Sequence, residues 1–347
     1  EEQITVEASA AQLETESSTV ASFRGEEEVR NLPLNTRNFS QLINLSAGAV
    51  PAQSQAGGLA ITAQRGTVAT SVNGVGFRSN NYRVDGLDNM ENHNGQGILI
   101  YPPVEAIQEF RVQTSVSSAE FGRGGGGSIN VTYKSGGREF HGSVFEFFRN
   151  AALDAKNFFD GPGKIAAFRM NQFGATLGGP VLLPGYNKDR DKTFFFFSYE
   201  GERRDQALTY LVTVPQPAYK GGDFAAAPFR IHDPLTTRPA ATGLGRQRDP
   251  FPNNALPASR LEAVGRNLIN LYPEPNRPGL VSNFGSNPGQ PVTRNNYDFK
   301  IDQSFSPRDQ GFFRLSRHFS DFDVPGSLPL PAVGSTNANT VKFPLLQ

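Results

Sequence analysis

The stretch that decides the fold begins at Pro102 as PPVEAIQEFRV and resumes at Ala119 as AEFGRGGGGSINVTYKSG. Pro102 and Pro103 fix the start of a short helix, which we expect from Val104 to Phe110. A Gly-rich crossing then leads into a strand over 128–133. From Phe140 onward the chain changes character, because aromatic residues begin to alternate with polar ones.

Composition excludes several classes of function. Lys plus Arg number 33 and Asp plus Glu number 33, so the chain has no basic field that would gather nucleic acid. It has no Cys, and its 4 His show no ligand spacing, so we expect no metal site and no cofactor. No apolar run is long enough for a transmembrane helix. The 36 Gly, 25 Pro and 28 Phe favour short strands joined by long loops.

The second half of the chain predicts strands with an unusual pattern of connections. Residues 297–305 and 313–320 alternate apolar with polar side chains, and 142–149, 168–181 and 193–203 are further strands. The connections over 151–167 and 207–292 are long, whereas those over 184–191 and 306–309 are short. Outer-membrane barrels alternate long external loops with short periplasmic turns in this way.

Four consecutive Phe at 194–197 fit the same interpretation. They place two rings on each face of a strand. In a membrane barrel the outer two would face lipid and the inner two would pack on a domain inside the barrel. In a soluble sheet both faces would have to be buried, as in the central strand of a two-sided core.

Two motifs with other possible meanings are interpreted as structural. Gly122-x-Gly124-x-x-Gly127 matches a dinucleotide-binding pattern, but a strand follows it where that site needs a helix. We therefore expect close backbone packing there. Asp85, Asp88 and Asn89 lack the closing Glu of a calcium loop and predict a turn. Nothing singles out a catalytic set, so we expect no enzyme.

A series of motifs, each weak alone, resembles the Oar-like branch of TonB-dependent outer-membrane receptors. In chain order they are LPLNTRNF (32–39), NYRVDGLDN (81–89), AEFGR (119–123), KSG (134–136), FHGS (140–143), NQFG (171–174), GGP (178–180), FFFSYEG (195–201) and LYPEPN (271–276). The resemblance implies an α+β plug domain followed by antiparallel strands of an incomplete transmembrane β-barrel, mainly β. It implies a linker segment over 1–22, a plug domain over 23–136, and barrel strands from 137 with an extracellular loop over about 207–292.

The resemblance also implies site residues. A segment like the TonB box, which an inner-membrane transducer pulls, spans Glu2, Gln3, Ile4, Thr5, Val6, Glu7 and Ala8. Its binding by strand addition needs few specified side chains. The plug motifs contribute Arg65, Gly66, Asp85, Gly86, Glu109, Arg111, Glu120, Gly122 and Arg123. Arg65 and Arg111 are expected to meet inward carboxylates of the barrel wall, such as Glu146 or Glu200.

The function implied is energy-coupled uptake of a scarce solute across the bacterial outer membrane, with the plug facing the periplasm and lumen. The partners would be a TonB-type transducer, outer-membrane lipid and an unidentified extracellular ligand. Transporter barrels have about 22 strands and this sequence predicts five, so we expect a fragment of a longer protein. The alternative is a cell-surface β-rich adhesin or glycan-binding protein, which would bury its Phe faces in soluble form.

Overall fold

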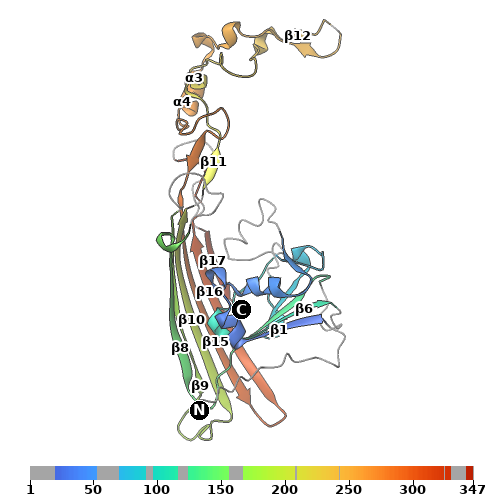
Figure 1. The fold of residues 1–347 in the computed structure, drawn as a ribbon, viewed down its shortest axis with the longest axis vertical. Coiled ribbons are helices and arrows are strands. Elements are labelled where there is room, and N and C mark those ends of the chain that lie inside the picture. The colour runs from blue at the N-terminus through green and yellow to red at the C-terminus, as the bar shows by residue number, and fades with distance from the viewer. Residues whose placement is uncertain are drawn as a thin grey trace, which may run out of the picture.

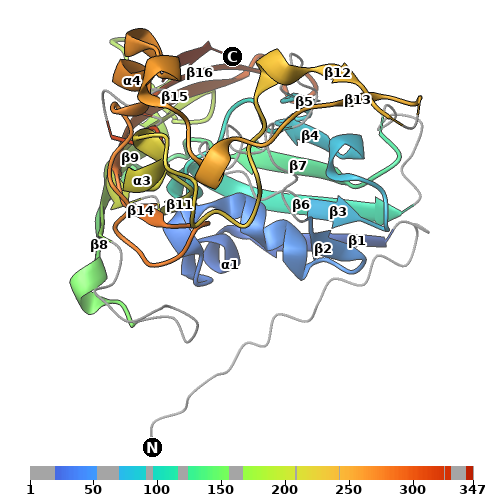
Figure 2. The ribbon, with the colours of Figure 1, turned by 90° about the horizontal axis from the view of Figure 1, so that it is seen from above.

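A computed structural model describes residues 20–52, 70–90, 97–115, 124–155, 167–207, 209–241, 243–323, 325–329 and 341–346. Two sheets dominate it. A tall sheet of long strands stands beside a smaller mixed domain, and an arm extends beyond one end of the tall sheet (Figure 1). Seen from above, the small domain lies against one face of the tall sheet (Figure 2). Among the described helices, none has the length and apolar character needed to cross a membrane.

The smaller unit, here called the plug domain, is a five-stranded sheet in the order β1-β6-β7-β4-β5. Only the β4–β7 pair is parallel. Its larger elements are β1 (Val20–Gly25), α1 (Glu26–Asn31), β4 (Asn81–Val84), β5 (Leu87–Asp88), β6 (Ile107–Ser115) and β7 (Ser128–Tyr133). A two-stranded sheet of β2 (Ala49–Pro51) and β3 (Thr70–Val72) and the short 3-10 helices at 35–37, 39–45, 77–79 and 104–106 complete it.

The core of the plug domain lies between this sheet and the helical segments. Phe110 and Val112 of β6, with Ile129 and Val131 of β7, are almost fully buried. Phe39, Leu42 and Ile43 of the second 3-10 helix cover them. The apolar side chains thus hold the sheet in a fixed shape, and the turns at its edge present polar groups to the tall sheet.

The predicted helix over Val104 to Phe110 is wrong for most of its length. Only Val104–Ala106 form a 3-10 turn, and β6 begins at Ile107. Ile107 and Phe110 have helical spacing, but pairing with β1 and β7 on both sides draws the segment into the sheet. A 3-10 helix, Phe39–Leu45, follows Asn38, whose side chain accepts from the backbone N–H of Ser40.

Gly124 and Gly126 of the crossing before β7 pack tightly against neighbouring backbone and side-chain atoms, as expected, whereas Gly125 faces open space. A Cβ on Gly124 would lie 2.2 Å from the backbone oxygen of Ser79, and one on Gly126 would lie 2.5 Å from the Asn80 side chain. These distances leave no room for a side chain, and the chain enters a strand rather than a helix. Gly122 lies outside the described residues.

The tall sheet, here called the wall, has six antiparallel strands in the order β17-β16-β15-β10-β9-β8. They are β8 (His141–Asn150), β9 (Phe168–Pro180), β10 (Thr193–Ala207), β15 (Gly289–Ser304), β16 (Gln310–Phe322) and β17 (Val341–Leu346). Five of them were predicted and β17 was not. The wall does not close on itself within the described residues. Its long and short connections alternate as the sequence indicated.

The two faces of the wall differ in chemistry. The inner face, toward the plug domain, carries Phe196, Ser198 and Glu200, all buried. The outer face is apolar and exposed, and includes Val144, Phe148, Tyr297, Phe313 and Leu315. Ring contacts join Phe173, Tyr199, Tyr297 and Phe319 across neighbouring strands of that face. An apolar outer band with aromatic residues and a polar interior is the pattern of membrane barrels.

The four-Phe segment splits between these faces. Phe196 is 1% exposed and belongs to the core of the plug domain, whereas Phe197, on the outer face, is 37% exposed. The alternative of a two-sided soluble core required both faces to be covered. Within the described residues the outer face has no such cover.

The connection between β10 and β15 forms the arm, residues 208–288 (Figure 1). It contains β11 (Tyr210–Val212), α3 (Pro217–Lys220), β12 (Arg238–Pro239), β13 (Arg246–Gln247), α4 (Ala263–Ile269) and β14 (Phe284–Ser286). In α4 the N-cap residue is Glu262. Val264 and Leu268 of this helix are exposed.

Candidate functional site

The polar contact between the plug domain and the wall centres on the turn after β4. Asp85 has φ +49°, a left-handed conformation that Asp tolerates better than most residues. Its backbone N–H donates to the Val131 oxygen at 2.8 Å, and its carboxylate accepts from the N–H of Tyr133 at 3.0 Å. Gly86 N–H donates to the Asn130 side chain at 3.1 Å. The predicted Asp-Gly turn is thus tied to the end of β7.

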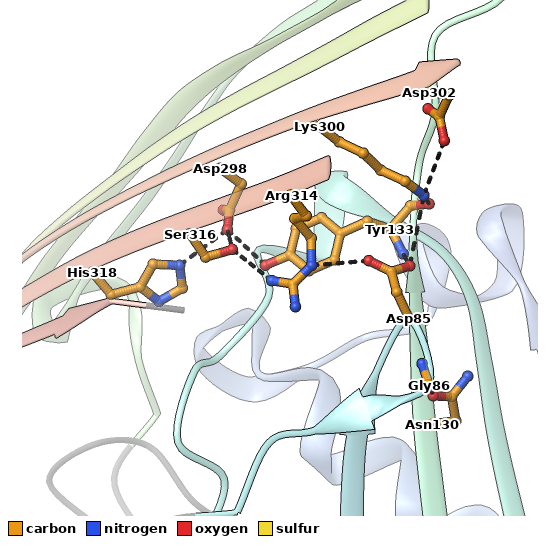
Figure 3. Close-up of polar contacts among 10 residues, drawn as sticks. All are labelled: Asp85, Gly86, Asn130, Tyr133, Asp298, Lys300, Asp302, Arg314, Ser316 and His318. Atoms are coloured by element: carbon orange, nitrogen blue, oxygen red, sulfur yellow. Dashed lines mark hydrogen bonds and ion pairs between the residues drawn. The ribbon is translucent and has the colours of Figure 1, made fainter. Parts of the chain in front are cut away.

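Asp85 reaches two cations of the wall (Figure 3). One carboxylate oxygen lies 3.0 Å from Nε of Arg314, and the other lies 3.7 Å from Nζ of Lys300. The side chains of Asp85, Arg314 and Lys300 are 4%, 2% and 7% exposed, so the contact is almost dry. Lys300 also donates to the backbone oxygen of Tyr133 at 3.4 Å.

Tyr133, the last residue of β7, makes the second contact with the wall. Its phenol donates to Asp298 at 2.7 Å, and the Ser316 hydroxyl donates to the same oxygen at 2.6 Å. Nε2 of His318 lies 3.3 Å from that oxygen. Burial raises the pKa of the Tyr133 phenol well above 10, and the neighbouring Asp298 carboxylate adds to the increase. The group therefore remains a donor at physiological pH.

We call Asp85, Tyr133, Asp298, Lys300 and Arg314 the latch cluster. Moving such charges out of water is costly, so the pairs contribute little net stability compared with an apolar contact of the same size. Removing one partner is different, because it leaves a buried charge uncompensated, at a cost of about 3–5 kcal/mol. The cluster therefore gives a contact that is specific while docked and that water can replace when the two surfaces separate.

A second contact lies elsewhere along the same interface. Nη2 of Arg37 lies 2.8 Å from Oε1 of Glu105, within the plug domain. The Arg37 guanidinium carbon lies 3.9 Å from the centre of the Phe147 ring of the wall. This distance is within the range of a cation–π interaction. Phe147 thus holds the plug domain through a cation that is already paired.

The structure places some of the predicted site residues and not others. Glu2, Gln3, Ile4, Thr5, Val6, Glu7, Ala8, Arg65, Gly66, Glu120, Gly122 and Arg123 lie outside the described residues. Asp85 and Gly86 lie at the centre of the interface. Glu109 and Arg111 lie in the middle of the plug sheet, opposite Gly25 and Phe23 of β1.

The two predicted wall carboxylates have different positions. Glu200 is on the inner face and is 7% exposed. Glu146 pairs in register with Phe173 on the outer face and is exposed, so its expected inward position needs correction. The cause is the two-residue period of a strand, which places Phe145 and Phe147 inward instead. The described ion pairs between plug domain and wall are made by Asp85, with Arg314 and Lys300.

Sequence reasoning missed the wall side of the latch cluster. Asp298 and Lys300 occupy the polar positions of the alternating strand predicted over 297–305, and Arg314 occupies one in 313–320. Charged residues at inward positions are the signal that would have found them. Their partners, however, are more than 150 residues away in the chain, and spacing alone does not show which plug residue they meet.

Comparisons with known proteins agree with this architecture. Residues 132–344 match a family model described as an outer membrane beta barrel domain. The chain is 34% identical over 173 residues to the TonB-dependent transporter Oar of Myxococcus xanthus, a match that covers 47% of this chain and 14% of that protein.

Solved structures resemble the fold. The outer membrane transporter YddB of Escherichia coli matches with a TM-score of 0.50 at 13% identity, over 89% of this chain and 34% of that one. The ferric enterobactin receptor PfeA of Pseudomonas aeruginosa, in a mutant form, matches with a TM-score of 0.47 at 14% identity, over 92% and 35%. The chain therefore spans about a third of the length of these two structures. Its match to Oar covers 14% of that protein. At such identities the likeness to solved structures concerns the fold alone.

Proposed function

The chain belongs to the outer-membrane β-barrel domain family, and from that membership we propose that it forms the plug and first wall strands of a receptor that imports a solute across the outer membrane. Import would draw on a TonB-type inner-membrane transducer, as the name of the relative Oar says of that protein. The transducer would pull the segment Glu2–Ala8 by strand addition. No covalent chemistry is needed for this function.

The observation that carries the proposal is the chemistry of the interface. A plug that only filled a core would meet the wall through apolar side chains. Here Asp85 meets Arg314 and Lys300, and Tyr133 meets Asp298, in a nearly dry contact. Water can solvate each of these groups after separation, so this polar part of the interface can separate without exposing a large apolar surface.

The arm supports the other half of the proposal, which is ligand capture outside the cell. It is held by its own polar contacts, so it keeps its shape away from the wall. Asn254 donates to the backbone oxygens of Phe224 and Phe229 and accepts from the N–H of Ile231. Arg238 binds Asp249 through two bonds of 2.7 Å, and Arg260 binds Asp233 likewise at 2.9 and 3.1 Å.

The experiment that tests the proposal is a double-mutant cycle in the full-length protein. Asp85→Asn keeps the left-handed turn, and Arg314→Gln keeps much of the side-chain length. Each single variant should weaken docking by about 3–5 kcal/mol, because it leaves one buried charge without its partner. The double variant should cost clearly less than the sum. Docking is measured as protection of the plug domain from protease, together with uptake.

Asp249→Asn is the matched control, because it breaks an Arg–Asp pair of similar length that is exposed and far from the wall. It should leave plug protection unchanged. Additive effects of the two latch variants, or uptake that is unaffected by both single changes, would argue against a releasable polar contact and therefore against the proposed mechanism.

A further inference from the structure

A cavity lies between the plug domain and the inner face of the wall, beside the latch cluster. Its volume is about 80 Å³. Plug residues 36–39 and 99–102 form one side, and strands β9, β10, β15 and β16 form the other. The polar side chains that matter here are Arg37, Gln172, Glu200, Glu202, Arg294 and His318.

The wall side of this cavity is rich in hydrogen-bond acceptors without donors. Gln172 and Glu200 are 3% and 7% exposed, and Oε1 of Gln172 and Oε2 of Glu200 have no hydrogen-bond partner in the part of the chain that the structure describes. Oε1 of Glu202 differs from these two atoms, because it lies 3.4 Å from Nε of Arg204. The oxygens of Gln172 and Glu200 are both acceptors, and a buried acceptor without a donor is costly. A group that fills the cavity and satisfies these acceptors must therefore carry an N–H or O–H donor.

The charges around the cavity select among donors. Arg37 is paired with Glu105 at 2.8 Å, and Arg294 is paired with Glu202 at 2.7 Å. Both cations on the lining therefore already face a carboxylate. Glu200 has no ion pair among the described residues, and the charged groups that act on it are the carboxylates of Glu202 and Asp298 and the guanidinium of Arg37. Glu200 is therefore the buried carboxylate of this lining without a cationic partner of its own, which favours a positively charged donor.

We propose that this cavity binds the cationic nitrogen group, ammonium or guanidinium, of a ligand, with Glu200 as its counter-charge and Gln172 as a second acceptor. The inference rests on the proposed function, because it gives a chemical feature to the imported solute. It also places a recognition point at the interface itself. A ligand held there contacts the plug domain and the wall together, so its binding and plug docking are linked.

The test uses the full-length protein in detergent and agmatine, a small molecule with one guanidinium and one ammonium group, as the probe. Calorimetry should show saturable binding with one site. Glu200→Gln, which keeps the shape and removes the charge, should weaken the affinity at least tenfold. Glu146→Gln is the matched control, since it removes a carboxylate from the exposed outer face of the same wall and should leave the affinity unchanged.

A second measurement does not depend on a variant. A hydrophobic carbodiimide modifies buried carboxyl groups, and agmatine should slow modification of the peptide that contains Glu200 in the unaltered protein. No saturable binding, equal affinity in Glu200→Gln, or no protection would each overturn the inference. The double-mutant cycle of Asp85→Asn and Arg314→Gln is measured without agmatine. The inference about the cavity can therefore fail while the proposed function stands.

Discussion

Individual residues of the latch cluster are held in position by the fold of the plug domain itself. Asp85 is fixed by two hydrogen bonds to the backbone of its own domain before it meets any cation of the wall. Tyr133 is fully buried, and the polar atom of its side chain, the phenol oxygen, donates to Asp298. The positions of both groups are therefore set by the fold of the plug domain, and docking costs little further ordering of side chains.

The phenol of Tyr133 gives a prediction about pH. Its pKa is raised in the folded state, so the docked protein keeps a proton that the unfolded chain releases above about pH 10. The protonated phenol contributes fully to the free energy of unfolding below pH 10. This contribution is lost as the pH rises from 10 toward the pKa of the folded state, by up to about 1.4 kcal/mol per pH unit.

Tyr133→Phe should cost about 1.5–3 kcal/mol near neutral pH, because the hydrogen bond to a charged acceptor is lost. It should also flatten the alkaline decline, which is measured as urea midpoints between pH 8 and 11. Some slope remains, because burial raises the pKa of Tyr82 as well. An unchanged slope in the variant would show that Tyr133 does not carry the effect.

At the scale of elements, the linker between the plug domain and the wall depends on one glycine. A Cβ on Gly136 would lie 2.3 Å from the Phe195 oxygen and 2.7 Å from the Gly179 oxygen, both backbone atoms of wall strands. A Cβ on the next residue, Gly137, would lie no closer than 4.0 Å to His141. At Gly136 the linker packs directly against the backbone of β9 and β10, with no room for a side chain.

Gly136→Ala should therefore destabilise the folded protein by about 1–3 kcal/mol through overpacking. Gly137→Ala should be close to neutral and is the matched control. Thermal unfolding of the two variants in detergent gives the comparison. Equal midpoints for both would mean that the close crossing is not a constraint.

The segment Glu2–Ala8 carries the energy-coupling part of the proposal. Strand addition needs a free backbone N–H at alternate positions, and proline removes one and fixes φ. Thr5→Pro should abolish energised uptake while surface display and ligand binding persist, and the mild change Val6→Ile should not. Uptake that survives Thr5→Pro would place the coupling segment elsewhere.

The elements also show what the sequence could and could not predict. The strands with alternating Phe and polar residues were predicted well, because one face is apolar whatever the partner. The helix expected from Val104 failed, because Ile107 and Phe110 fit a helix locally while β1 and β7 impose a strand. The pairing of Asp85 with Arg314 depends on docking between distant segments, and no local pattern contains it.

At the scale of the whole molecule, the two faces and the two ends of the wall indicate how it is oriented in the outer membrane. The outer face of the wall is apolar and exposed, and the inner face is polar and holds the plug domain (Figure 2). The long arm leaves one end of the wall, and the short turn over 306–309 lies at the other, between β15 and β16. We therefore expect the outer membrane to separate the arm from that turn.

Cysteine labelling on intact cells tests this claim most directly, because the chain has no Cys of its own. Leu244→Cys, at an arm position that is 84% exposed, should react with a membrane-impermeant maleimide on intact cells. Ser306→Cys, in the short turn, should react only after the outer membrane is opened. Labelling of Ser306→Cys on intact cells, or equal labelling of both before and after opening, would contradict the account.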